Sequence, residues 1–284
     1  MFNHYLTTRF NLKSANWDVT KNNELLLTDE WMDNRMWLFE NFCFPSVVAQ
    51  TNQNFTWVLY FDSNTKDIYK TRILELIKSY PNFKVFFING MDSFYPEFLQ
   101  FIKVESNDKP YLITTRIDND DSIHKDFINE VQKHFNQQEY RAIDFITGYS
   151  LQIEPNFILG KKEQLFNPFI SLIEKNVNPK TAIHQDHRHW KRDEKVTQIA
   201  GKRLWLSIIH QRNKVNKFDG YGNVNWENLK TDFILSEEAN NLITKNTIPF
   251  TDWIFTSIKN QITQGFELNF KLLKRKLGLY NFIK

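Results

Sequence analysis

This sequence contains very little cysteine, glycine and proline. Its single cysteine, Cys43, excludes an internal disulfide and argues against a zinc site built from cysteine thiolates. With 8 Gly and 8 Pro in 284 residues, the chain shows no Gly/Ser linker, internal repeat or low-complexity tract. The low cysteine count fits a protein of a reducing compartment.

The sequence also lacks a long apolar run and an excess of charge of one sign. No apolar stretch approaches the ~18 residues that a membrane-spanning helix needs, and no secretory signal is visible at the N-terminus. Lys and Arg number 36 and Asp and Glu 33, so the balance predicts no nucleic-acid partner. We expect one large domain or two small ones, located in the cytoplasm.

What is abundant is aromatic: 26 Phe, 10 Tyr and 8 Trp. Most of these rings are expected to form a Phe-rich core. A few are expected in a binding site, because amphipathic rings pack on the faces of sugars and bases.

Short apolar segments alternate with helix-like segments in the first half of the chain. The expected strands cover residues 4–10, 55–61, 83–88 and 111–117, and the expected helices cover residues 29–43, 67–79 and 125–136. This alternation indicates βαβ units and a mainly parallel sheet. We therefore predict an α/β, Rossmann-like fold with helices flanking a mainly parallel central sheet.

The second half gives weaker signals. We expect strands at 141–147, 150–154 and 203–210, a helix at 160–174, and a polar, His-rich loop at 176–193. Helices are expected within 226–246 and at 250–262, followed by a basic, aliphatic tail over 266–284. The C-terminal region is thus predicted to be helical.

Three carboxylates follow the apolar segment that ends at Ile117. Asp118, Asp120 and Asp121 lie so close together that their repulsion calls for a cation or a cationic partner. A divalent cation held by one or two carboxylates and by substrate phosphates is one solution, and a turn or a helix cap is the alternative. Ligands bind beyond the carboxyl ends of parallel strands, so Asp62, just after another strand, could share this site.

Several blocks of sequence occur in the order seen in a known family. They are TTRFN (7–11), RMWLFENFCFPSV (35–47), FTW (55–57), FD (61–62), TRIDNDD (115–121) and WLSIIHQRN (205–213). Together these blocks, which span roughly residues 5–215, resemble the rhamnosyltransferase family, related to inverting, family 2-like glycosyltransferases of the GT-A fold.

The resemblance implies a metal-dependent transferase that uses Mn²⁺ or Mg²⁺. It implies a nucleotide-diphosphate sugar as donor, a hydroxyl of a glycan or glycolipid as acceptor, and inversion at the transferred sugar. It also implies a GT-A core over residues 1–215, with a helical extension over 216–284 that packs on the core and faces acceptor or membrane. One departure is Asp62-Ser63-Asn64-Thr65, where related enzymes often carry Asp-Asp-Gly-Ser.

The resemblance assigns roles to the acidic cluster. Asp120 is the expected metal ligand, and Asp118 is expected to bind the ribose, a metal-bound water or the metal itself. Asp121 replaces either one if the register differs by one residue. His210 ends an expected strand and is the candidate third ligand, with a hydrogen-bonded structural role as its alternative.

Other polar residues have two readings each. Asp62 is expected to bind the base edge or ribose, or to cap the helix that begins near residue 67. Arg9 is expected to contact the base or the diphosphate, while Arg116 binds substrate or pairs with the acidic cluster. For Arg35 we expect support of a helix surface or a pair with Glu40.

A general base and a sugar-stacking ring are expected within residues 184–190. Asp186 is the first choice for the carboxylate that takes the acceptor proton, with Asp193 and Glu194 behind it. Trp190 stacks on a sugar face or packs in the core. A mobile, solvated loop is the alternative for the whole segment.

The tail over residues 266–284 alternates basic and apolar side chains. Such a helix either lies peripherally on the inner face of an anionic membrane or packs on the domain with its lysines in water. Two other functions stay open at this point. One is a metal-dependent nucleotidyltransferase or phosphohydrolase, and the other is a non-catalytic carbohydrate-binding protein on a degenerate transferase scaffold.

Overall fold

The structure is a computed structural model that describes residues 1–14, 27–213 and 216–281. Its centre is a seven-stranded sheet in the order β10-β6-β9-β4-β1-β2-β3. The strands are β1 (Phe2–Arg9), β2 (Thr56–Asp62), β3 (Phe83–Ile88), β4 (Tyr111–Arg116), β6 (Tyr140–Phe145), β9 (Ser171–Lys175) and β10 (Val196–Ile199). Only β9 runs antiparallel to its neighbours, so the expected mainly parallel sheet is confirmed.

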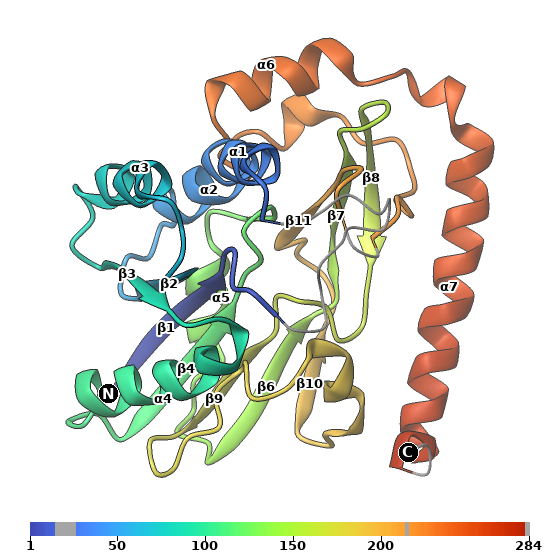
Figure 1. The fold of residues 1–284 in the computed structure, drawn as a ribbon. Helices are drawn as coiled ribbons and strands as arrows, with labels where there is room; N and C mark the ends of the chain where they lie inside the picture. Colours follow the sequence, from blue (N-terminus) through green and yellow to red (C-terminus); the bar gives the residue numbers. More distant parts are fainter. Residues whose placement is uncertain (15–26, 214–215, 282–284) are drawn as a thin grey trace.

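Helices cover both faces of this sheet (Figure 1). They are α1 (Asp29–Leu38), α2 (Phe44–Val48), α3 (Asp67–Ile77), α4 (Phe94–Glu105) and α5 (Phe127–Lys133). Because side chains alternate along a strand, Trp57 and Leu59 pack with α1, α2 and α3, whereas Val58 and Tyr60 pack with α4. The result is three layers with the sheet in the middle.

A second, four-stranded sheet follows the order β5-β11-β7-β8. Its strands are β5 (Ser122–Ile123), β7 (Thr147–Gln152), β8 (Ile158–Glu163) and β11 (Trp205–Ile209). Gly148 is required here, since a Cβ at this position would lie 2.1 Å from the Trp205 ring. Residues 226–243, including part of α6 (Glu237–Asn246), complete a hydrophobic cluster with Leu38 and Phe42.

Several local predictions are confirmed and others are wrong. Thr28 caps α1, accepting a hydrogen bond from Trp31 N at 3.2 Å. The helix expected at 160–174 is absent from this described segment, which instead forms the end of β8, a loop and β9. Gly160 pairs with β7 and approaches Tyr221 N so closely that its Cβ would lie at 2.5 Å. The last long helix, α7 (Ile254–Lys276), extends well beyond the expected 250–262.

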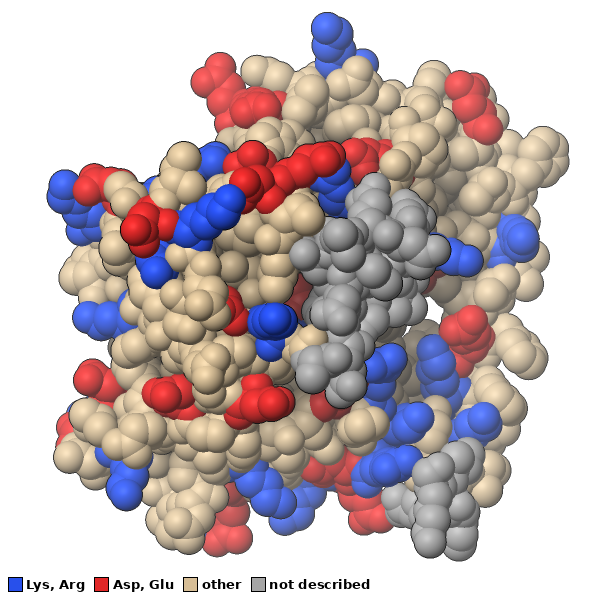
Figure 2. Space-filling view, viewed as in Figure 1, with Lys and Arg blue, Asp and Glu red and all other residues tan. Residues whose placement is uncertain are grey.

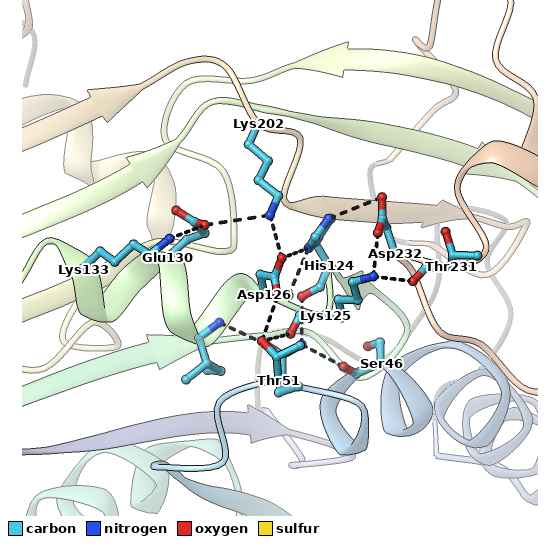
Figure 3. A network of polar contacts seen from close by, with 12 residues as sticks. Ser46, Thr51, His124, Lys125, Asp126, Glu130, Lys133, Lys202, Thr231 and Asp232 are labelled. Carbon is cyan, nitrogen blue, oxygen red and sulfur yellow. Dashed lines mark hydrogen bonds and ion pairs between the residues drawn. The ribbon is translucent and has the colours of Figure 1, made fainter.

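A polar network fixes the chain just after the acidic cluster (Figure 3). Lys202 Nζ and Thr51 Oγ1 both donate to Asp126 at 2.7 Å and lower its pKa to about 2. Lys125 Nζ lies 2.9 Å from Asp232. These bonds join the segment after β5 to the loops before β2, before β11 and before α6.

Candidate functional site

A cavity of about 1220 Å³ opens where β1 and β4 end. Its lining includes Arg9 at the end of β1, the loop 118–121 after β4 and Asn213 after β11. The clustered aspartates therefore face a pocket, at the edge of the sheet where the parallel strands end. On its other side the cavity is lined by residues of α7, among them Gln264. The cavity is visible as a hollow beside α7 in Figure 2.

Asp120 is the centre of the polar contacts in this cavity. Its Oδ2 lies 2.6 Å from Arg35 Nη1, 3.0 Å from His210 Nε2 and 3.3 Å from Asn213 Nδ2. Burial alone would raise the pKa of Asp120, but Arg35 and His210 bring it below the ordinary value. Asp120 is therefore an ionised carboxylate at neutral pH.

The contact between Arg35 and Asp120 corrects the prediction that Arg35 pairs with Glu40. Residues five apart on a helix point in different directions, and Glu40 instead binds Arg72 through two bonds of 2.6 Å. Arg35 also donates to Asn119 Oδ1 at 3.2 Å and lies over the Trp31 ring, 5.2 Å from its centroid. A buried guanidinium is thus part of the site.

His210 lies beside Asp120 at the end of β11, and its Nε2 is hydrogen-bonded to the Asp120 carboxylate. Its role as a metal ligand stays a prediction. Burial lowers the pKa of His210, and this outweighs the opposite effect of Asp120, so the imidazole is neutral. Because Nε2 faces an ionised carboxylate at 3.0 Å, the neutral ring carries its hydrogen on Nε2 and donates it to Asp120. Binding of a metal ion by Nε2 would require this hydrogen to move to Nδ1.

Asp118 and Asp121 make different contacts from Asp120. Asp118 Oδ1 accepts from Arg116 Nη2 at 2.9 Å, which is the alternative expected for Arg116: a pair with the cluster. Asp121 Oδ1 accepts from Ile208 N at 2.9 Å and so holds β11 against the acidic loop. Burial, together with Asp120 and Asp118, raises the pKa of Asp121 well above its usual range.

The donor set fits a metal ion with two protein ligands. Among the described residues, no group of three or more His, Cys, Asp or Glu side chains could hold an ion. Asp120 and His210, however, present a carboxylate and an imidazole 3.0 Å apart. Mg²⁺ commonly binds through one or two carboxylates, with substrate phosphates and water completing its shell.

Asp62 lies in a smaller adjoining cavity of about 280 Å³, which shares Asn11 and Leu27 with the large one. Its carboxylate accepts from Lys13 N and Asn64 N, both at 3.0 Å. The alternative role as a helix cap is wrong, because α3 begins after Lys66. Binding of a base or ribose by Asp62 stays a prediction.

Arg9 lines the large cavity and lies near Arg116, Asp118 and Asp186. Burial and the charge of Arg116 lower its pKa. Within the described part of the chain, its one side-chain hydrogen bond is to Met91 Sδ at 3.9 Å. The guanidinium is therefore placed to bind an anion in the cavity.

Asp186 also lines the cavity, and its side chain is 33% exposed. It caps a short 3-10 helix (His187–Arg192) and accepts from Arg188 Nε at 2.8 Å. Although burial raises the pKa of Asp186, its bonds with Arg188 lower it overall. Asp193 accepts from Tyr140 Oη at 2.7 Å, and neither Asp193 nor Glu194 lines the cavity.

Trp190 is completely buried, which contradicts its predicted role as a sugar platform. Its ring packs in a hydrophobic cluster with Ala142 and Val196, and His184 lies edge-on to it at 5.0 Å. Core packing was the alternative, and it is what the fold provides. The His-rich segment thus contributes Asp186 and His187 to the lining of the cavity, while the buried Trp190 packs this segment against the core.

Comparison of this chain with known families identifies its relatives. A family model described as "Putative rhamnosyl transferase" matches residues 2–220. The chain belongs to this rhamnosyl transferase family. The family match, with the mixed α/β architecture, confirms the expected GT-A fold class. None of the curated protein sequences matches the chain.

Solved structures that resemble this family member are distant in sequence. S. aureus TarS 1-349 in complex with UDP is 9% identical, with a TM-score of 0.42, covering 73% of this chain and 60% of that chain. A "putative nucleotide-diphospho-sugar transferase" from Desulfovibrio desulfuricans G20 is 11% identical, with a TM-score of 0.41, covering 87% of this chain and 99% of that one. The chain thus spans 60% of the TarS fragment that it resembles.

Sequence reasoning missed two residues of this candidate site. Arg35 was assigned to a helix surface, and Asn213 was given no role although it follows His210 by three residues. Asn213 Oδ1 accepts from His210 N at 2.7 Å, and its Nδ2 lies 3.3 Å from Asp120. An Asn shortly after a strand-ending His was a usable signal for Asn213, because Asn commonly folds back on nearby backbone.

Proposed function

We propose that this protein transfers a sugar from a nucleotide-diphosphate donor to a hydroxyl of a glycan or glycolipid. The observation that carries the proposal is the arrangement around Asp120. An ionised carboxylate, a buried guanidinium and a neutral imidazole converge at the carboxyl edge of a parallel sheet, beside a large cavity. Membership of the rhamnosyl transferase family supports the same reaction class.

In the proposed complex the donor extends from the small cavity into the large one. Asp62 and the small cavity receive the base or ribose, and Asp118 bonds to the ribose or to a metal-bound water. Arg9 lies on the path of the diphosphate with no ion pair to a carboxylate among the described residues. Guanidinium suits this role because its planar fork of donors matches phosphate oxygens.

Asp120 and His210 would hold Mn²⁺ or Mg²⁺. The ion would neutralise the departing diphosphate as a Lewis acid. Arg35 adds a second positive charge 2.6 Å from the same carboxylate. It keeps Asp120 ionised before the donor arrives, and this second positive charge lies close enough to help neutralise the diphosphate.

The acceptor hydroxyl is proposed to lose its proton to Asp186. The hydroxyl oxygen forms a bond to the anomeric carbon, the bond from that carbon to the diphosphate breaks, and the proton passes to the carboxylate. The pair with Arg188 orients Asp186 and also makes it a weak base, so transfer requires that the acceptor displace part of this pair. Inversion is proposed from the family relation.

The acceptor is proposed to enter the part of the cavity that α7 lines. A chain of sugars, free or attached to a lipid, fits its size, and synthesis of a polysaccharide is the corresponding process. Across the described residues, no helix combines the length and apolar character needed to cross a bilayer. Contact with a membrane is proposed to be peripheral, through the basic C-terminal region.

Product analysis tests this function. With Mn²⁺ and a panel of nucleotide-diphosphate sugars, we expect release of nucleoside diphosphate at a rate about 100-fold lower in Asp120→Asn. Asp67→Asn is the matched control, because the Asp67 side chain is 96% exposed, and it should keep full activity. Release of pyrophosphate would indicate a nucleotidyltransferase, and full activity of Asp120→Asn would contradict the proposed site.

A further inference from the structure

Helix α7 is amphipathic with its polar side turned toward the protein. Gly222 N donates to Ser257 Oγ at 2.8 Å, and Asn260 Nδ2 donates to the carbonyl of Gly220 at 2.9 Å. One turn further on, Gln264 accepts from Glu163 N at 2.9 Å. A surface helix usually docks through an apolar stripe, so this polar contact is an inversion of the common pattern.

The apolar side chains of α7 consequently face away from the domain. Seven exposed apolar side chains form a stripe: Phe255, Ile258, Ile262, Phe266, Phe270, Leu273 and Leu277, which directly follows the helix. Their spacing of three or four residues places them on one face. Phe270 lies at the edge of this stripe and also lines the cavity, while the less exposed Ile254 and Leu272 lie to one side of it. Phe255 is 85% exposed and Phe266 70%, and the rings of Phe266 and Phe270 stack at 5.9 Å. Figure 1 shows α7 along one flank of the molecule, with no other helix or strand on its outer side.

The charge of α7 is strongly positive. The helix carries the five basic residues Lys259, Lys271, Lys274, Arg275 and Lys276, and Glu267 is its one acidic residue. Four of the five lie in its last two turns, where Lys274 Nζ sits 4.3 Å from the Phe270 ring centroid. Arg275 ties this end to the core by donating to the carbonyl of Val196 at 2.6 Å.

We propose that α7 is a docking surface for an anionic lipid bilayer. A stripe of seven apolar side chains buries itself at the headgroup boundary, and the exposed Lys259 and Lys276, which do not line the cavity, meet anionic headgroups. A second copy of the chain in parallel orientation is a poorer occupant, because the two basic ends of α7 would then lie side by side. Leaving this face exposed to water is less favourable still, since a contiguous apolar face of this size is unusual on a soluble monomer.

Docking through α7 would also place the cavity at the bilayer. Gln264, Leu268 and Lys271 line the cavity from the inner side of the same helix. If the proposed transfer function holds, a lipid-linked acceptor could reach the donor site without leaving the membrane. The docking itself does not depend on that function, and vesicle binding measures it without any substrate.

Co-sedimentation with vesicles tests the proposal. We expect the protein to bind vesicles containing phosphatidylglycerol, to bind phosphatidylcholine vesicles weakly, and to lose binding as salt is raised. Phe266→Glu should lower the partition coefficient on the order of tenfold or more, because burial of a Phe side chain in apolar surroundings is lost. Ile68→Glu is the matched control: Ile68 on α3 is also 70% exposed, and this variant should bind like the original chain.

Both variants should retain the circular dichroism spectrum and melting temperature of the original chain, since neither side chain supports the core. Absence of binding to anionic vesicles would overturn the proposal. Equal losses in Phe266→Glu and Ile68→Glu would do the same. A concentration-dependent dimer in sedimentation equilibrium that Phe266→Glu dissociates would replace the bilayer by a second copy of this chain.

Discussion

Replacing Asp120 by Asn should destabilise the fold far more than the same change at Asp121. Asp120→Asn leaves the Arg35 guanidinium, whose side chain is 9% exposed, without its carboxylate. Removing one partner of a buried ion pair typically costs about 3–5 kcal/mol. The site borders an open cavity that admits water, so we expect the lower end, about 3 kcal/mol.

Asp121→Asn is the matched control in the same loop. The pKa of Asp121 is raised well above its usual range, so its protonated form is close in shape and charge to Asn. The carbonyl oxygen of Asn can still accept the hydrogen bond from Ile208 N. We expect a loss of about 1 kcal/mol or less.

Urea unfolding followed by tryptophan fluorescence measures both changes. The pKa of Asp120 is lower in the folded chain than in the unfolded chain. Its contribution is therefore fully present above the unfolded pKa of about 3.9 and declines as the pH falls toward the folded pKa. The difference between the original chain and Asp120→Asn should be constant between about pH 6 and 8 and shrink below about pH 4.

A double variant separates pairing from other effects. Arg35→Met combined with Asp120→Asn removes both charges. The double variant should therefore lose less stability than the sum of the losses of the two single variants. Equal losses for Asp120→Asn and Asp121→Asn, or strict additivity with Arg35→Met, would refute the view that Arg35 and Asp120 form a buried pair.

Three further changes test other parts of the site. His210→Gln should raise the Mn²⁺ concentration needed for half-maximal turnover about tenfold or more, because an imidazole ligand is lost. An unchanged metal titration would exclude His210 from the metal site. Asp186→Asn should lower kcat of transfer about 100-fold while donor affinity stays constant, because only proton removal is affected; a change in donor affinity alone would exclude the base role. Burial raises the pKa of Asp144 to about 7, so the unfolded chain loses this proton first and stability should fall as pH rises from about 4 to 7. Urea midpoints of Asp144→Asn should lack that slope, and an unchanged slope would assign it to other groups.

The sequence predicted the parts of the fold that depend on local patterns. The strands β1 to β4 and the cap at Thr28 follow from apolar runs and a side chain near the first turn. The acidic loop after β4 was found because three carboxylates end an apolar run. Because these carboxylates directly follow a strand of a predicted parallel sheet, their position in the sequence placed them at the edge where ligands bind in such sheets.

The errors concern contacts between distant parts of the chain. Arg35 meets Asp120 across 85 residues, and no local pattern indicates that contact. Residues 160–174 contain enough apolar side chains to suggest a helix, but pairing of β8 with β7 and of β9 with β4 decides their conformation. Trp190 has a side chain of the type that stacks on sugars, and only the packing around it shows that it is buried.

The outward apolar face of α7 lies between these two cases. Its basic and apolar composition was visible in the sequence, but the side facing the protein was not. Ser257 and Gln264 turn inward because the backbone of Gly222 and Glu163 offers them hydrogen bonds. Residues 282–284 of the expected basic tail lie outside the described residues, and the division at residue 215 stays a prediction.

Calorimetric titration of nucleoside diphosphates, with Mn²⁺ or with a chelator, measures whether a cation links the acidic cluster to the nucleotide. We expect the best-bound nucleotide to bind at least about tenfold more tightly with Mn²⁺, and His210→Gln and Asp120→Asn to abolish this difference. Equal affinity with and without the metal in the original chain would contradict the claim that Asp120 and His210 act on the diphosphate through a cation.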